Sequence, residues 1–184
     1  RWDMSYLGTY SDDRQPTVER LLNETARRLP HRNFCVAGPQ YPDTIDWPAN
    51  VERIDHVPPA DHPAFYAASR FTLNVTRGDM IKAGWSPSVR LFEAGACATP
   101  VISDVWDGLS DLLEPGREIL FAHSTDDVIV ALEGIEPDRA RAIGHAARHR
   151  VLAEHTAAHR AAELERHIAE ARTLSAAAGQ EQTA

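Results

Sequence analysis

The sequence predicts an α/β domain built on a mostly parallel sheet with helices on both faces. Short apolar runs alternate along the chain with segments whose apolar residues recur at helical spacing. The runs are unbroken rather than alternating, which is typical of strands covered on both sides. Short connections between them indicate a chain that crosses repeatedly from strand to helix and back. A length of 184 residues suits one such domain followed by a tail.

Each expected element has a local signal. Gly8 ends the first apolar run, Gly38-Pro39 stops the second, and Pro115-Gly116 makes a turn before the last. Strands are expected at 5–9, 33–37, 51–57, 71–76, 100–103 and 118–122. Helices are expected at 16–29, 63–69, 86–98, 125–133, 137–154 and 157–174. Loops are expected at 39–50 and 77–84. The predicted domain is residues 1–174, and residues 175–184 are expected to form an unordered tail.

Composition restricts the partners and the compartment. A net charge of −8 argues against nucleic acid or an anionic membrane surface as the main partner. No apolar run is long enough to cross a bilayer, and no charged-then-apolar leader opens the chain. Cys35 and Cys97 lack metal or redox spacing, which indicates core residues of a reducing compartment and predicts a cytoplasmic location. Because the chain begins at Arg1, close to a strand, we expect a piece of a longer protein.

The helix expected at 86–98 carries one polar stripe on an otherwise apolar surface. Ser86 and Pro87 suit the N-cap and the first helical position. Arg90 and Glu93 follow on the same face. Free N–H groups at the helix start, with an arginine one turn in, suit a phosphate, and the glutamate suits sugar hydroxyls. The alternative is an internal Arg90–Glu93 ion pair at i, i+3.

Three polar stretches follow predicted strands, at 8–14, 76–90 and 103–111. In parallel sheets, ligands bind beyond the carboxyl ends of the strands. The stretches gather cations in a chain that is acidic as a whole, which favours a diphosphate over a neutral metabolite. Neither Gly-x-Gly-x-x-Gly nor Gly-x-x-x-x-Gly-Lys-Ser/Thr occurs, which argues against a dinucleotide or NTPase site. Asp104, Asp107 and Asp111 are expected to cap turns here.

Four stretches carry a family resemblance. They are Tyr-Leu-Gly-Thr-Tyr at 6–10, followed by Arg14; the segment 63–77; Ser-Pro-Ser-Val-Arg-Leu-Phe-Glu-Ala-Gly-Ala-Cys-Ala-Thr-Pro-Val-Ile-Ser-Asp at 86–104; and Asp-Gly-Leu-Ser-Asp-Leu-Leu-Glu-Pro-Gly-Arg-Glu-Ile-Leu at 107–120. Together they resemble the nucleotide-sugar-binding half of GT-B glycosyltransferases, family-one type, and most of all the spore-maturation (CgeB-like) group. The resemblance implies a Rossmann-like C-terminal domain that binds a nucleoside diphosphate sugar. A missing N-terminal domain would hold the unknown acceptor.

The resemblance also implies roles for single residues. The loop after the first strand and the start of the helix before the key glutamate contact the diphosphate, and they fall on Gly8, Thr9, Tyr10, Ser86, Ser88 and Val89. Arg14 and Arg90 are the cations expected near the phosphates, and Glu93 is expected to bond the ribose. Arg77, which ends a strand, is expected to touch the donor. The first glutamate of the family's E-x7-E motif falls on Trp85, which leaves donor-sugar contact and retention or inversion open.

No metal ion and no cofactor is expected, and no catalytic residue is assigned. The chain contains no Asp-x-Asp, which agrees with charge stabilisation by helix amides and basic side chains. The pairs His145/His149 and His155/His159 have a spacing that suits zinc, but arginines surround them, and solvated helix faces are expected instead. Two alternatives stay open: a sugar-nucleotide epimerase of the same architecture, and a binding module that has lost turnover.

Overall fold

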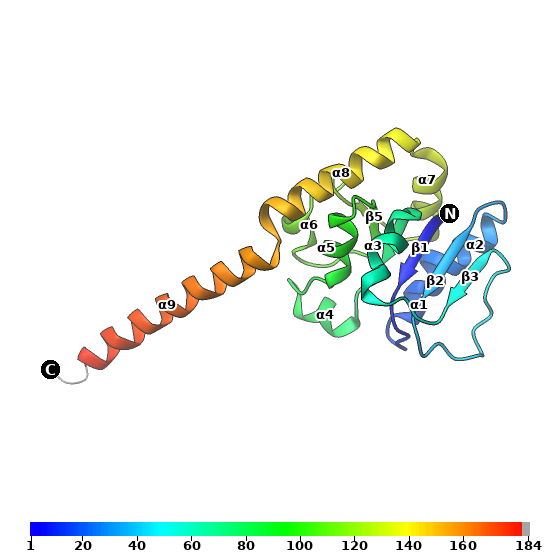
Figure 1. The fold of residues 1–184 in the computed structure, drawn as a ribbon. Helices are drawn as coiled ribbons and strands as arrows, with labels where there is room; N and C mark the ends of the chain where they lie inside the picture. The colour runs from blue at the N-terminus through cyan, green and yellow to red at the C-terminus, as the bar shows by residue number, and fades with distance from the viewer. Residues whose placement is uncertain (182–184) are drawn as a thin grey trace.

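The computed structural model describes the backbone of residues 1–181 and the side chains of residues 1–173. Within this range six strands form one parallel sheet in the order β3-β2-β1-β4-β5-β6 (Figure 1). They are β1 (Trp2–Leu7), β2 (Phe34–Ala37), β3 (Val51–Ile54), β4 (Ser69–Asn74), β5 (Val101–Ser103) and β6 (Leu120–Phe121). This strand order is that of a Rossmann-like domain, and every strand pair is parallel. The predicted fold class is confirmed.

Helices cover both faces of the sheet. On one face, α1 (Gln15–Val18), the π-helical segment η1 (Glu19–Asn23) and α2 (Glu24–Arg28) follow one another and pack against α7 (Thr125–Gly134). On the other, α5 (Val89–Ala96) packs between α3 (His62–Ala67) and α8 (Pro137–Glu154). The remaining helical segments are η2 (Pro59–Asp61), α4 (Gly78–Ala83), α6 (Leu109–Leu112) and α9 (Ala157–Glu181). Figure 1 shows α9 extending away from the body of the domain.

The two faces of the sheet contribute to two apolar cores. One face packs with α1–α2 and α7, and its cluster includes Met4, Tyr6, Phe34, Val36, Phe71, Leu73, Leu21, Leu22, Val128 and Leu132. The other packs with α3, α5 and α6, and its cluster includes Cys35, Ala37, Val101, Phe65, Leu91 and Leu109. In β2 alternate side chains enter the two cores: Phe34 and Val36 enter one, Cys35 and Ala37 the other. Burial on both faces explains why the strands read as unbroken apolar runs in the sequence.

Two predictions around the central helix are wrong in detail. The expected loop 77–84 contains the short helix α4, which ends at Gly84 with φ +63°, a conformation that glycine adopts readily. The helix expected from Ser86 begins at Val89. Ser88 is its N-cap: this residue has extended backbone angles, and its hydroxyl accepts a hydrogen bond from the N–H of Arg90 at 3.4 Å. The Ser-Pro pair therefore lies in the approach to the helix and not in its first turn.

The chain ends also differ from the expected boundaries. The first strand begins at Trp2 rather than at Ser5. Helix α9 continues past the expected boundary at Leu174 to Glu181. The last part of the expected tail, residues 182–184, lies outside the described residues. No helix in the described part of the chain combines the length and apolarity that a membrane span needs.

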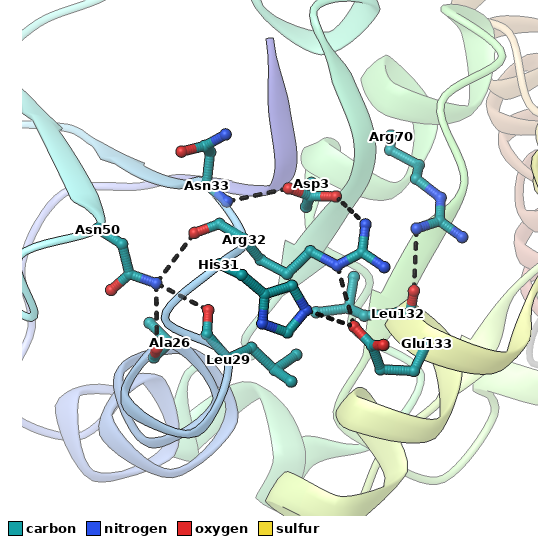
Figure 2. Close-up of polar contacts among 10 residues, drawn as sticks. All are labelled: Asp3, Ala26, Leu29, His31, Arg32, Asn33, Asn50, Arg70, Leu132 and Glu133. Carbon is teal, nitrogen blue, oxygen red and sulfur yellow. Dashed lines mark hydrogen bonds and ion pairs between the residues drawn. The ribbon is translucent and has the colours of Figure 1, made fainter.

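A polar network closes the amino-terminal edge of the sheet (Figure 2). Arg32 donates to Asp3 at 3.0 Å and to Glu133 at 2.9 Å, so it joins β1 to α7. The Asn50 side-chain amide lies 3.0 Å from the carbonyl oxygens of Ala26, Leu29 and Arg32. These bonds fix the turn after α2. The carboxyl-terminal edge, in contrast, holds the buried Arg14 and Arg90, which form no ion pair within the described residues, and the predicted site residues lie there.

Candidate site at the carboxyl ends of β1 and β4

The sheet has one topological switch point, between β1 and β4. From β1 the chain moves outward through β2 and β3, whereas β4 returns beside β1 and leads outward through β5 and β6. At such a point the connections leave in opposite directions, so the carboxyl ends of the two strands are not crossed by a connection. Four polar side chains and one glycine gather here, and we call them the edge cluster: Tyr6, Arg14, Asn74, Arg90 and Gly8.

Arg90 connects the two strands at this point. Its side chain is buried, with 6% exposed, although it belongs to α5. Nε donates to the carbonyl oxygen of Leu7 at 2.7 Å, and Nη1 donates to Oδ1 of Asn74 at 2.8 Å. The guanidinium lies 4.9 Å from the centre of the Tyr6 ring. These contacts place the start of α5 at the ends of β1 and β4.

The internal Arg90–Glu93 pair that the sequence allowed is not formed. No ion pair joins the two side chains in the part of the chain that the structure describes. Glu93 is directed toward α3 instead, where its Oε2 accepts from the Tyr66 hydroxyl at 3.4 Å and lies 3.5 Å from Nδ1 of His62. Burial raises the pKa of Tyr66 above its ordinary value. The Glu93 side chain stays 44% exposed, so its carboxylate is accessible.

The loop after β1 surrounds the cluster at close range. A Cβ at Gly8 would lie 2.8 Å from both Nη2 of Arg90 and the hydroxyl of Tyr6, so any side chain there would displace these groups. The Tyr6 hydroxyl is buried without a hydrogen-bond partner among the described residues. Arg14 is also buried, with 8% exposed. Its Nη2 donates to the carbonyl oxygen of Thr9, while its Nε is buried and unpartnered within the described chain.

Neither buried arginine of the edge cluster has an acidic partner. Arg14 and Arg90 take part in no ion pair within the described residues. Both bond mainly to carbonyl or amide oxygens, which carry only partial charge. The buried Asp104 interacts with the charge of Arg90 only at longer range, and a buried cation that no carboxylate contacts directly is costly in a protein. The edge cluster therefore has the electrostatic character of a site for an anion.

A buried carboxylate, that of Asp104, orders the ends of β4 and β5. Asp104 accepts from the N–H of Thr76 at 2.9 Å and from its hydroxyl at 2.8 Å. The side-chain amide of Asn74 donates to the Ser103 hydroxyl at 2.9 Å, which orients its Oδ1 toward Arg90. Burial raises the pKa of Asp104, against the lowering effect of the Thr76 hydrogen bonds. Asp104 thus links the segments that follow β4 and β5, a contact across the sheet edge rather than within a turn.

Asp13 links the loop after β1 to α4. Its Oδ2 accepts from the N–H of Gly78, the first residue of α4, at 2.7 Å. Hydrogen bonds from Ser11 and then from Gly78 lower the pKa of Asp13 below its ordinary value. Arg77, just before Gly78, is the exposed N-cap residue of α4. This contact joins the connections that leave β1 and β4.

The structure thus brings part of the predicted set together. Gly8, Thr9, Arg14 and Arg90 share the edge cluster or touch it. Tyr10 lies further out, where its hydroxyl donates to Asp12 at 2.6 Å. Ser88 caps α5, Val89 is 70% exposed, and Ser86 and Arg77 make no side-chain hydrogen bond within the described residues.

Sequence reasoning missed three residues that hold the site: Asn74, His62 and Tyr66. Asn74 had a signal, since it is a polar residue near the end of an apolar strand. His62 and Tyr66 lie four residues apart on α3, the spacing of one helix face, and that spacing was the signal available.

Comparison with known proteins gives the family. The profile of the family described as glycosyl transferase-like matches residues 14–166. Comparison with curated protein sequences gives no significant match. Among solved structures, sucrose-phosphate synthase from Thermosynechococcus elongatus superposes with a TM-score of 0.73 at 18% identity over 96% of this chain and 46% of that chain. Anabaena HepE in complex with UDP gives 0.68 at 16% identity over 94% of this chain and 48% of that chain.

A third solved structure, T4 phage BGT in complex with UDP-glucose, gives a TM-score of 0.63 at 14% identity over 83% of this chain and 45% of that chain. The chain thus spans about half the length of these relatives. The strand order and the edge cluster define a Rossmann-like domain with its polar groups at the topological switch point. The chain belongs to the glycosyl transferase-like family.

Proposed function

We propose that this chain is the donor-binding domain of a glycosyltransferase that takes its sugar from a nucleoside diphosphate. The observation that carries the proposal is the pair of buried guanidinium groups at the switch point, Arg14 and Arg90, neither of which forms an ion pair within the described residues. A diphosphate supplies the missing counter-charge and the acceptor oxygens that a guanidinium fork prefers. The family match favours glycosyl transfer over the epimerase alternative.

The proposed arrangement follows the geometry of α5. The diphosphate lies at the start of α5, between Gly8 and the exposed Val89, where the helix dipole and the first amides favour an anion. Arg14 and Arg90 stabilise the charge that develops on the leaving diphosphate, in place of a metal ion. Glu93 bonds the ribose hydroxyls from one turn further along α5, and Tyr66 and His62 orient it.

The rest of the reaction belongs to a second domain in this proposal. Relatives of about twice this length share the fold, so we infer that an N-terminal half holds the acceptor and that this chain is the C-terminal half of a GT-B enzyme. We also place the protein in the spore-maturation (CgeB-like) group. The free cysteines Cys35 and Cys97 support a cytoplasmic location.

Nucleotide binding to the wild-type chain tests the proposal. Calorimetry with UDP, GDP and dTDP should give binding by at least one of them. The tightest ligand should raise the thermal midpoint as its concentration increases. Each charge-assisted hydrogen bond contributes about 1.5–3 kcal/mol, so Arg90→Gln and Arg14→Gln should each weaken binding roughly 10- to 100-fold.

Arg141→Gln is the matched control. Arg141 is an exposed arginine of α8 that pairs with Asp138, and its replacement should leave the dissociation constant unchanged. Thermal unfolding of each variant separates lost binding from lost folding. Absence of binding by all three nucleotides, or equal affinities of the folded Arg90→Gln, Arg14→Gln and wild-type chains, would rule the proposal out.

A further inference from the structure

One large aromatic side chain stands exposed just before α5, the helix that carries Arg90 of the edge cluster. Trp85 is 65% exposed and lies between α4 and the N-cap of α5. The chain has four tryptophans. Trp2 and Trp106 are buried, with 6% and 5% exposed, and Trp47 packs partly buried against the core. A strongly exposed indole is therefore particular to position 85 in this protein.

The backbone holds this indole in a fixed and unfavourable conformation. Trp85 has φ +53°, in the left-handed region that bulky residues rarely adopt. Its N–H donates to the carbonyl oxygen of Asp107 at 2.9 Å. The ring packs on Gly108, where a Cβ would lie 2.6 Å from ring atoms Cδ2 and Cε3. Gly108 itself has φ +97°. Two left-handed residues thus seat one side of the indole against a glycine and leave most of its surface open.

We propose that Trp85 is the platform on which the hexose ring of the donor stacks, an inference that rests on the proposed function. The C–H groups on one side of a pyranose form an apolar surface with slight positive charge, and they complement the negative face of an aromatic ring. The position suits the donor, because Ser88 is the third residue after Trp85 and three Cα steps span at most about 11 Å. A sugar joined to a diphosphate at the start of α5 lies within that reach.

The occupant is the donor sugar rather than a protein surface. Trp85 is the only large aromatic ring among its exposed apolar neighbours in the described chain, Ile81 and Val89. Its indole also carries an N–H, which is free to bond a sugar hydroxyl. Gly108 packs against one face of the ring, and the exposed remainder of the indole is available to a flat ligand. Trp85 accordingly acts as a specificity-determining residue for the sugar, and the nucleotide is held elsewhere.

The experiment compares a nucleotide with its glucose ester. Calorimetry gives the affinities of UDP, GDP and dTDP and of UDP-glucose, GDP-glucose and dTDP-glucose for the wild-type chain. Trp85→Asn removes the ring and keeps the left-handed backbone, which asparagine tolerates. Trp85→Phe keeps a smaller ring. We expect Trp85→Asn to weaken binding of the glucose ester roughly tenfold, to leave the free nucleotide unchanged, and Trp85→Phe to recover part of the loss.

Fluorescence of the wild-type chain gives a second readout that needs no variant. The glucose ester, and not the free nucleotide, should protect the exposed indole from acrylamide quenching. In the calorimetry Val130→Ala, which alters a residue of α7 that is 69% exposed, is the control and should leave the affinities of nucleotide and ester unchanged.

The outcomes separate the two proposals. Binding of free nucleotide with equal ester affinity in Trp85→Asn and wild type overturns the platform and leaves the proposed function standing. Protection of the indole by free glucose or maltose as strong as that by the ester overturns the assignment to the donor. No binding by any nucleotide or ester overturns both.

Discussion

Replacement of Gly38 by alanine tests whether close packing between two loops holds the candidate site. Gly38 follows β2, has φ +139°, and donates its N–H to the carbonyl oxygen of Ile54 at 2.8 Å. A Cβ there would lie 2.5 Å from the carbonyl carbon of Gly8 and closer still to its oxygen. Alanine therefore forces the loop after β1, which borders Arg90 and Arg14, to move.

The cost has two parts. A left-handed backbone at a non-glycine residue costs about 1–2 kcal/mol. Displacing a packed backbone segment costs about 1–3 kcal/mol. The expected loss in the free energy of unfolding is thus about 2–5 kcal/mol. Gly116→Ala isolates the first part, since Gly116 has φ +76° and a Cβ there meets nothing within 4 Å. Its expected loss is about 1–2 kcal/mol.

Urea unfolding measures the difference between the two variants. With a slope of about 2 kcal/mol per molar urea, Gly38→Ala should lower the midpoint by roughly 1–2.5 M and Gly116→Ala by less than about 1 M. Nucleotide affinity should fall in Gly38→Ala alone, because only this variant displaces Gly8. If Gly38→Ala is no less stable than Gly116→Ala, the close contact with Gly8 does not exist and the reasoning fails.

Three further predictions concern other parts of the molecule. Burial raises the pKa of Asp104 above its ordinary value of 3.8, so the folded chain binds the carboxyl proton more tightly than the unfolded chain does. Protonation of Asp104 therefore contributes its full stabilisation at low pH, and this stabilisation is lost as the pH rises through the raised pKa. Asp104→Asn should remove this slope in urea unfolding, and equal slopes would contradict the burial argument. Glu93→Gln should weaken UDP binding about tenfold with little change in thermal midpoint, and 2′-deoxy-UDP should bind both proteins alike; a loss equal for both nucleotides would place Glu93 away from the ribose. Gly144→Ala should cost about 1–3 kcal/mol, because its Cβ would lie 2.7 Å from the carbonyl carbon of Ala98, whereas Gly134→Ala, with nothing within 4 Å, should not, and equal stabilities would exclude that contact.

The fold was predictable because its signals are local. Each strand is a short apolar run bounded by glycine or proline, and both faces of the sheet are buried, so the pattern survives without any knowledge of neighbours. Short helices were less predictable. Residues 78–83 form α4 although six residues are too few to show a helical period, and Asp13 accepts a hydrogen bond from the N–H of its first residue. Such a contact leaves no periodic pattern in the sequence.

The site was predictable in position and only partly in its bonds. Strand ends and the start of a helix locate the carboxyl edge from sequence alone, and Arg90 and Gly8 lie there. The partners of Arg90 were not predictable, since Leu7 contributes a backbone oxygen and Asn74 comes from a strand that pairs with β1 only in the folded sheet. From the sequence, either Ser86 or Ser88 could cap the helix. Backbone angles decide between them, and Ser88 has the extended angles of an N-cap.

The hydrogen bond between Asp13 and the N–H of Gly78 ties the two connections at the switch point together in the absence of a nucleotide. A ligand that binds to loops already held in position loses little affinity to the entropy cost of ordering them. The lowered pKa of Asp13 keeps its carboxylate ionised well into mild acid, and the tie weakens only as the pH falls toward that lowered value. The two connections therefore stay linked in the same way at neutral pH and at pH values well below it.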